Sequence, residues 1–548
     1  MSKRMPPALV LSAVLFVTFG FAATKKIQHN DTSGDWNDWS FRAASLVNAG
    51  SSVSGGWNTL PSGFENASLL KWGNFGSSPV PKFIENPDRW LGGVGNWDDY
   101  YKWDNGVPTD GNQVYIESNN RNGDRVTLDV SATVQQLYLG QNSPLPVSGW
   151  VLTDDGQLRT LTITSGLHLR QGGHLSFSGG STLSVEDVLN SGTIGLQNKS
   201  TLMVSGNVIN SASLGTGGSG GNTVNITGYL NNAIPGLGGG PTPVFVLGGS
   251  GDIATIGGNV TNSTTFEVLS KSTATIGGNL TNNSGGLVDV EDGSTLHIKG
   301  AVTNSAGGSG FGIFTSFYGT GGNTLNIDGM LTNSGNFQLN GPGDVATVGS
   351  LTNSGEVDLD KHSSLDVDGG HLTNYGVINV KNGSAVVAQY PGTLINLGTI
   401  NIDSMSTFLV GTGNHGLGYI QLANGTLGEM IDSYSSFGVI NVNGSALLAG
   451  TLDILLQDGF NPILGSKFKF LIAAPGQVSG SFSVIYNDLF NCNDKTCEYF
   501  YPLYDRADGY VELVVEEKTR PASEPATLLV LIPGLLGVGY GLRRKLLG

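Results

Sequence analysis

Cysteine, basic charge and helical periodicity are all scarce in this sequence. Only two cysteines occur in 548 residues, and charged residues make up 13% of the chain. The formal net charge of −16 lacks the basic footprint that nucleic-acid binding requires, so no nucleic-acid partner is expected. No 3.6-residue apolar period runs through the middle of the chain, and the 84 glycines would destabilise helices there. A hydrophobic content of 39% is nevertheless enough for a continuous core, which excludes a disordered chain.

The two cysteines, Cys492 and Cys497, stand in a loop-like stretch that reads N-C-N-D-K-T-C. The sequence has no C-x-x-C pair and no second Cys/His pair that could complete a zinc site. The seven histidines are dispersed and form no H-x-x-x-H motif. We therefore expect no metal and no cofactor. A local disulfide is the favoured interpretation in an exported protein, with a redox or metal-binding pair as the alternative.

The first 22 residues predict a secretory signal peptide. Lys3 and Arg4 precede an apolar run over 8–22, and Gly20 and Ala22 supply the small residues of a cleavage site. This pattern predicts export through the Sec translocon and removal of residues 1–22. A retained membrane anchor is the alternative.

The C-terminal 26 residues, 523–548, combine a short polar motif, an apolar run and a basic cluster. The apolar part, 526–542, has 17 residues, which is the lower limit for crossing a hydrocarbon core of about 30 Å. A basic cluster after it favours leaving that end in the cytoplasm, with the bulk of the chain translocated. The sequence thus predicts a hydrophobic helix that holds the chain in the inner membrane. The residues that carry this signal are Ser523, Glu524, Pro525, Ala526, Arg543, Arg544 and Lys545.

This tail resembles the PEP-CTERM sorting signal, whose usual start is V-P-E-P-A-T. The resemblance covers about 25 residues, and Ser523 stands where the family commonly has proline. It implies recognition by exosortase, a membrane cysteine protease-transpeptidase, with processing near Glu524–Pro525 and release or anchoring at the surface. It also implies a bacterium that makes extracellular polysaccharide. A plain membrane anchor is the alternative.

A repeat of about 21 residues fills the middle of the chain. The phrase Gly-x-aliphatic-Thr-Asn-Ser recurs, and seven of the nine spacings between its asparagines lie between 20 and 22 residues. Blocks of 94 and 92 residues repeat on top of this period, which indicates duplication of a four-coil unit. The recurring asparagines are Asn190, Asn210, Asn232, Asn262, Asn282, Asn304, Asn333, Asn353, Asn374 and Asn396.

Between the asparagines, apolar and polar residues alternate in short segments such as F-E-V, V-D-L and I-N-I. This period of two predicts strands with one buried face. One such coil cannot bury its apolar face alone, so the coils must stack. We predict an all-β, right-handed parallel β-helix over 161–410, with insertions in rim loops. Asparagine suits one corner because it tolerates left-handed backbone and its amides can form a ladder. A row of β-sandwich modules, which would repeat near the block length, is the alternative.

Different sequence flanks the repeat on both sides. Residues 23–89 are loop-rich, and residues 90–160 are expected to form an N-terminal cap and the first coils. Within them, the tryptophans of 90–116, the turn over 106–108 and the strand over 114–116 resemble the start of autotransporter-like surface β-helices. There, Trp90, Trp97 and Trp103 are interpreted as a plug of the core end, with an aromatic sugar-binding platform as the alternative. Within residues 411–515, the stretch from V-I-N-V-N-G-S-A-L-L-A-G-T-L to G-Q-V-S-G-S-F, at 439–482, resembles the terminal β-domain of autotransporter-like and PEP-CTERM passenger proteins. This resemblance implies that residues 411–515 form a C-terminal cap. Residues 516–522 are predicted to be a linker.

The search for catalytic chemistry finds one group of acids. Asp358, Asp360, Asp366 and Asp368 fall in x-D-x-D patterns that face outward and suit a cation or a sugar, or simply solvent. Arginine is absent from Asn210 to Asn396, which leaves a transition-state anion few partners. The sequence therefore favours an exported, non-catalytic structural or adhesive surface protein that contacts extracellular polysaccharide. A surface-displayed polysaccharide lyase or hydrolase is the alternative.

Overall fold

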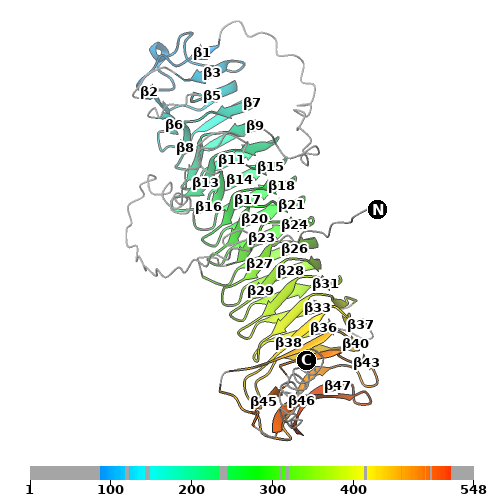
Figure 1. The fold of residues 1–548 in the computed structure, drawn as a ribbon. Coiled ribbons are helices and arrows are strands. Elements are labelled where there is room, and N and C mark those ends of the chain that lie inside the picture. The colour runs from blue at the N-terminus through cyan, green and yellow to red at the C-terminus, as the bar shows by residue number, and fades with distance from the viewer. Residues whose placement is uncertain are drawn as a thin grey trace, which may run out of the picture. The chain divides into compact units, whose positions relative to one another are not determined.

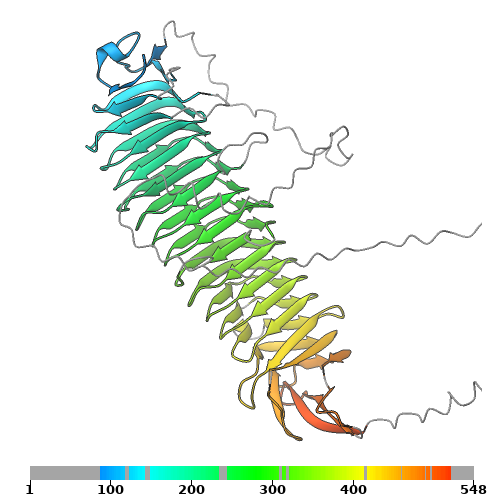
Figure 2. The same cartoon turned by 60° about the vertical axis from the view of Figure 1, so that its left-hand side comes forward.

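The computed structural model describes residues 87–117, 123–141, 149–233, 243–307, 312–315, 320–389, 391–412, 416–457, 459–487, 489–493 and 496–519. These residues belong to one structural unit, 65–548. Apart from one turn of 3-10 helix, η2 (Tyr100–Lys102), the regular elements in the described residues are β-strands. Successive strands stack along a parallel β-solenoid of about 15 turns, as Figures 1 and 2 show.

A typical coil holds three short strands, and β19, β20 and β21 form one such coil. β19 pairs in parallel with β16 before it and β22 after it, while β20 and β21 pair with their own counterparts in the next coil. The first strand of each coil builds the narrow sheet of the solenoid, and the other two build the wide sheet. In several coils those two strands merge into one longer, bent strand, as in β7 and β26.

The strands of the narrow sheet are β2 (Val94–Asn96), β4 (Arg125–Leu128), β6 (Trp150–Asp154), β8 (Gly173–Phe177), β10 (Thr193–Gln197), β13 (Ser213–Gly217), β16 (Val244–Leu247), β19 (Thr265–Val268), β22 (Leu287–Val290), β25 (Gly312–Thr315), β27 (Asn336–Leu339), β29 (Glu356–Leu359), β32 (Val377–Val380), β35 (Thr399–Ile402), β38 (Thr426–Ile431), β41 (Thr451–Leu456) and β44 (Val484–Tyr486).

The strands of the wide sheet are β1 (Asp88–Arg89), β3 (Gln113–Ile116), β5 (Ala132–Leu139), β7 (Thr160–Leu169), β9 (Thr182–Asn190), β11 (Thr201–Val204), β12 (Val208–Asn210), β14 (Thr223–Ile226), β15 (Leu230–Asn232), β17 (Ile253–Ile256), β18 (Val260–Asn262), β20 (Thr273–Ile276), β21 (Leu280–Asn282), β23 (Thr295–Ile298), β24 (Val302–Asn304), β26 (Thr324–Asn333), β28 (Val345–Asn353), β30 (Ser364–Val367), β31 (Leu372–Asn374), β33 (Ala385–Gln389), β34 (Leu394–Asn396), β36 (Thr407–Thr412), β37 (Gly416–Gln421), β39 (Val439–Val442), β40 (Gly444–Leu448), β42 (Lys467–Ile472), β43 (Val478–Gly480), β45 (Leu489–Phe490), β46 (Thr496–Asp505) and β47 (Tyr510–Thr519).

The apolar alternation in the sequence fixes which residues point inward. In β19, Phe266 and Val268 are fully buried, whereas Thr265 and Glu267 face outward. The register places Phe266 directly after Phe245 of β16, and the two rings stack with centroids 4.7 Å apart. Because like residues pair from coil to coil, the buried side chains form one continuous core, as the sequence predicted.

Glycine stands two residues after five of the ten recurring asparagines and allows adjacent coils to approach closely at that corner. A β-carbon on Gly355 would lie 2.1 Å from the carbonyl oxygen of Gly335, and one on Gly376 would lie 2.1 Å from that of Gly355. No side chain fits at such a distance from backbone. The high glycine content is therefore a packing requirement of the stacked corners as well as a source of turns.

The solenoid extends beyond the predicted bounds of 161–410. Strand β1 lies inside the segment 23–89 that was predicted to be loop-rich, and it already pairs in parallel with β3. At the other end, parallel coils continue through β43 and β44, inside the predicted cap 411–515. The prediction of a linker over 516–522 was wrong for residues 516–519, because they belong to β47 and pair with β46.

Antiparallel strands and phenylalanines close the C-terminal end of the solenoid. β47 pairs in antiparallel fashion with β42 and with β46, and β46 also pairs with β45. The ring of Phe500 packs against Phe468 and Phe490, with centroids 5.9 and 4.8 Å apart. These strands cover the last coils at the red end of Figure 1, and the rings fill the end of the core.

Candidate functional site

The three tryptophans of the N-terminal cap lie inside the protein. Trp90, Trp97 and Trp103 are 3, 0 and 3% exposed, and Trp103 packs edge-on against both other rings at 5.0 and 5.2 Å. The indole nitrogen of Trp103 donates to the carbonyl oxygen of Trp97 at 2.9 Å. A sugar ring cannot reach these faces. The interpretation of the three tryptophans as a glycan platform was therefore wrong, and the cap holds them as part of the core.

The same cap exposes other apolar side chains. Tyr101 is 86% exposed and Tyr100 is 64% exposed, and their rings meet edge-on with centroids 5.6 Å apart. Leu91, whose backbone nitrogen donates to the carbonyl oxygen of Lys102, and Val94 are 61 and 70% exposed. We call these four residues the tip cluster. Sequence reasoning missed it because the two tyrosines stand between tryptophans and share their aromatic character.

Carboxyl groups accompany the tip cluster. Asp99 caps η2, since its side chain accepts from the backbone nitrogen of Tyr101 at 3.1 Å. A hydrogen bond between the carboxyl groups of Asp98 and Asp129 raises the pKa of Asp98. The turn ending at Asp99 and the turn ending at Lys102 both carry an i→i+3 backbone bond. Asp99 itself has extended backbone, with φ of −70° and ψ of 97°, so the two turns do not form one continuous helix.

The recurring asparagines form one hydrogen-bonded column inside the solenoid. All ten, from Asn190 to Asn396, are fully buried. The side-chain nitrogen of each donates to the side-chain oxygen of the next, with nine distances of 2.7–3.0 Å. The nitrogen also donates to the first backbone carbonyl of a narrow-sheet strand, as Asn304 does to Asn336 at 2.7 Å. Each amide thus links the two sheets and two coils.

The conformational reason expected for these asparagines was wrong. They are the last residues of wide-sheet strands, and none of the ten has a positive φ. Left-handed backbone occurs at another corner, for example at Ser270 and Lys271 with φ of 60° and 61°. The asparagines therefore recur for their side-chain bonds. The column continues one coil further at Gln421, whose oxygen is 3.5 Å from the Asn396 nitrogen.

A second buried polar column was not predicted. From Ser181 to Ser406, it occupies the position just before the first wide-sheet strand of the coil and alternates among serine, asparagine and aspartate. In most successive pairs the backbone nitrogen donates to the side-chain oxygen of the next residue, as from Ser200 to Asn222, from Asn222 to Asp252 and from Asp252 to Ser272. This column has the same period as the asparagines, but its residue type varies. A search for one recurring amino acid therefore does not find it.

An aromatic column also runs along the outside of the first wide-sheet strands. The rings of Tyr115, Tyr138 and His168 stack at 4.5 and 4.6 Å with interplanar angles of 4° and 5°. Burial, together with the charge of Arg170, lowers the pKa of His168. Arg170 pairs with Glu117 at 2.5 Å. Because the ring faces are already occupied by one another, this column stabilises coils and offers no open stacking surface.

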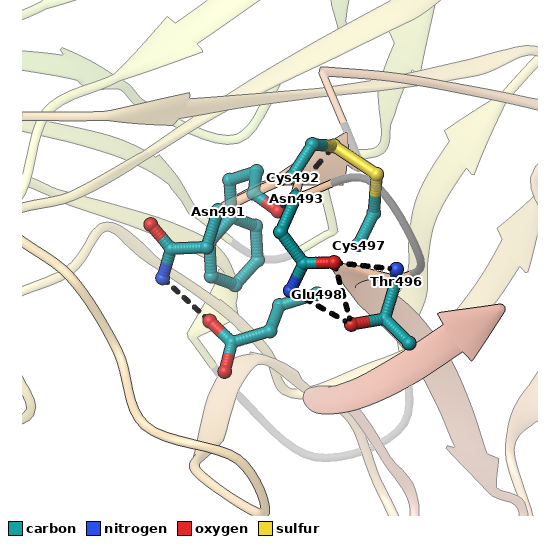
Figure 3. Close-up of a disulfide and its surroundings, with 7 residues drawn as sticks. Asn491, Cys492, Asn493, Thr496, Cys497 and Glu498 are labelled. Carbon is teal, nitrogen blue, oxygen red and sulfur yellow. Dashed lines mark hydrogen bonds between the residues drawn. A yellow bond between two sulfur atoms is a disulfide. The ribbon is translucent and has the colours of Figure 1, made fainter. Parts of the chain in front are cut away.

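The structure pairs Cys492 with Cys497 in a disulfide next to the β45–β46 turn, shown in Figure 3. Asn493 accepts from the backbone nitrogen of Thr496 at 2.8 Å and donates to its hydroxyl at 3.1 Å. Asn491 bonds Glu498 across the same turn. These bonds hold the ends of the hairpin together at the edge of the C-terminal cap.

The outward acids do not form one cluster. Asp358 lies in β29 of the narrow sheet and Asp366 in β30 of the wide sheet, so the two x-D-x-D pairs face different sides. Asp358 pairs with Lys381 at 2.7 Å. Within the described ranges, no three His, Cys, Asp or Glu side chains are placed to hold a metal ion.

One acid lies in the core. Glu429 of β38 is fully buried between Ile402 and Ile454 of the neighbouring coils, and neither carboxyl oxygen has a hydrogen-bond partner. Burial raises its pKa well above the ordinary value. It is a candidate for a pH-sensitive coil rather than for catalysis, because nothing exposed adjoins it.

The predicted signal peptide, 1–22, and the sorting residues Ser523 to Lys545 lie outside the described residues. In the part of the chain that the structure describes, no helix has the length and apolar character needed to span a membrane.

Comparisons with known proteins found little similarity to this chain. No family model matches the chain, and no curated protein matches it. Among solved structures, the crystal structure of the Haemophilus influenzae Hap adhesin is similar over 74% of this chain and 64% of that one, at 13% identity and a TM-score of 0.16. This chain thus spans less than two thirds of the length of that structure. The protein is a parallel β-solenoid with buried polar columns.

Proposed function

We propose that the protein is an exported structural or adhesive component of a bacterial surface or extracellular matrix, processed by exosortase and associated with exopolysaccharide. The observation that carries the proposal is a long, coherently bonded rod whose sequence continues into an apolar and basic sorting-type tail. A rod of stacked coils needs neither cofactor nor moving parts, and it can hold one end far from an anchor.

The N-terminal leader and the C-terminal tail supply the route in this proposal. The leader directs the chain to the Sec translocon, and residues 526–542 retain the translocated chain in the inner membrane until the bond near Glu524–Pro525 is processed. The solenoid then remains at the surface or is released into the matrix.

The test is mass spectrometry of the native C-terminus together with cell fractionation. We expect a C-terminus near Glu524 in the surface or matrix fraction, and accumulation of the full-length chain in the inner membrane when Glu524→Ala and Pro525→Ala are combined. Glu517→Ala, at an exposed position of β47 outside the tail, is the matched control and should be processed normally. A native chain that ends at Gly548 in the cytoplasm would contradict the proposal.

A lyase and hydrolase assay on uronate and neutral polysaccharides decides the catalytic alternative. If the purified protein cleaves a polysaccharide and the Asp358→Asn variant does not, the role is enzymatic and not structural.

A further inference from the structure

The four side chains of the tip cluster are exposed, and none of them belongs to the buried core. The core end beneath it is already filled by Trp90, Trp97 and Trp103, so the exposed rings add nothing to that plug. Tyr100 rests on Gly106, where a β-carbon would lie 2.9 Å from the ring, and this contact fixes the ring without burying it. Exposed apolar clusters of this kind on soluble proteins mark interaction sites.

The chemistry of the cluster suits sugar rings. Tyrosine gives a large, rigid contact surface at low entropic cost, with a polar tip that remains hydrated. The two tyrosine rings meet edge-on, and Leu91 and Val94 expose further apolar side chains on the same cap. The backbone nitrogen of Asp98 donates to the carboxyl group of Asp129 at 3.3 Å, so this end of the solenoid also carries neighbouring carboxyl groups that can accept from sugar hydroxyls.

The negative charge of this end of the solenoid favours neutral polysaccharides over acidic ones. The segment 88–129 has eight Asp and Glu residues and four Lys and Arg residues. Lys102 is already engaged, because its ammonium lies over the ring of Trp90 at 5.7 Å and donates to the carbonyl oxygen of Gly92 at 3.3 Å. A uronic-acid polymer would meet like charge here, whereas a neutral polymer would not.

We propose that the tip cluster of Leu91, Val94, Tyr100 and Tyr101 is a binding site for a neutral polysaccharide at the N-terminal end of the solenoid. This inference rests on the proposed surface function and locates its adhesive contact. β1 and β2 lie at the opposite end of the solenoid from β46 and β47, which precede the sorting tail, so the site is at the end far from the anchor (Figure 1).

The experiment measures binding of the full chain to immobilised neutral oligosaccharides, with alginate as the uronate comparison. We expect retention on neutral sugars, little on alginate, and a loss of at least about tenfold in affinity for Tyr101→Ser and for the Tyr100→Ser/Tyr101→Ser double variant. Tyr375→Ser is the matched control, because Tyr375 is 56% exposed in the middle of the solenoid and should not matter. Thermal unfolding of Tyr101→Ser should match the wild type.

Several results would overturn the site. They are full binding by the double variant, equal binding to alginate, or no binding to any neutral sugar. Protection of Tyr101 from hydroxyl-radical oxidation in the sugar-free chain would mean that another part of the chain covers the ring. A dimer lost in Tyr101→Ser would assign the cluster to a second copy. If the protein is nevertheless exported and found in the matrix, the proposed function stands while the tip site fails.

Discussion

Replacing Asn304 with alanine tests whether the asparagine column holds the coils together. Three groups depend on this amide: the side-chain nitrogen of Asn282 donates to it at 3.0 Å, and it donates to Asn333 and to the carbonyl of Asn336 at 2.7 Å each. All lie inside the solenoid, where a polar group that loses its partner costs about 1–3 kcal/mol. Asn282 keeps a bond to Gly312, so we expect a total loss of roughly 3–5 kcal/mol.

The readout must be local, because a solenoid is quasi-one-dimensional and its unfolding need not be two-state. Native-state hydrogen exchange of β21, β24 and β26 reports the free energy of opening at the altered rung. We expect faster exchange there, with little change in coils several rungs away.

Thr303→Ala is the matched control for Asn304→Ala. Thr303 precedes Asn304 in β24 and faces solvent, so its truncation should change the opening free energy by no more than about 0.5 kcal/mol. If the two variants exchange alike, the buried amides do not bear the coil-to-coil stability, and apolar stacking alone holds the rod.

Three further perturbations follow from other parts of the structure. Glu429→Gln should raise the midpoint of thermal unfolding at pH 7 but not near pH 4, because a raised pKa in the folded state makes stability fall as pH rises through it; an equal effect at both pH values would contradict this. The Cys492→Ser/Cys497→Ser pair should destabilise the cap hairpin by about 2 kcal/mol in hydrogen exchange of β46, with Thr496→Ser as control. Gly355→Ala should prevent folding, detected as loss of soluble protein, whereas Gly343→Ala, at an open turn, should reduce stability only.

The sequence predicted the fold because its strongest signals are local and repeated. Apolar alternation identifies inward residues such as Phe266, and the 21-residue period of the asparagines identifies equivalent positions in successive coils. Neither signal shows where the solenoid begins or ends. Coils continue into residues 411–486 after the Asn phrase has stopped, because Gln421 takes over the column and the parallel pairing persists.

The candidate site could not be predicted in the same way. Trp103 and Tyr101 are both aromatic and stand two residues apart, yet one is in the core and the other in solvent. Alternation would bury both, but η2 interrupts the strand and rotates Tyr101 outward. The second polar column has Ser200, Asn222 and Asp252 at successive positions. Each of these residue types has a side-chain oxygen that can accept a hydrogen bond, so the bonding is kept although the amino acid changes.

Most positions along the solenoid are used for packing between coils, which explains why a binding site is expected at one of its ends. Along the rod, most inward positions are committed to the core or to a polar column, and a β-carbon on the corner glycines Gly355 and Gly376 would collide with the backbone of the preceding coil. Much of the outward surface is also committed to coil-to-coil contacts, as with the stacked Tyr115 and Tyr138 rings and the Lys381–Asp358 pair. In the tip cluster, Val94 lies in a strand that pairs with the next coil, whereas Tyr100 and Tyr101 lie in η2, outside the sheets. The two tyrosines can therefore change with the ligand while the rod beneath them remains the same.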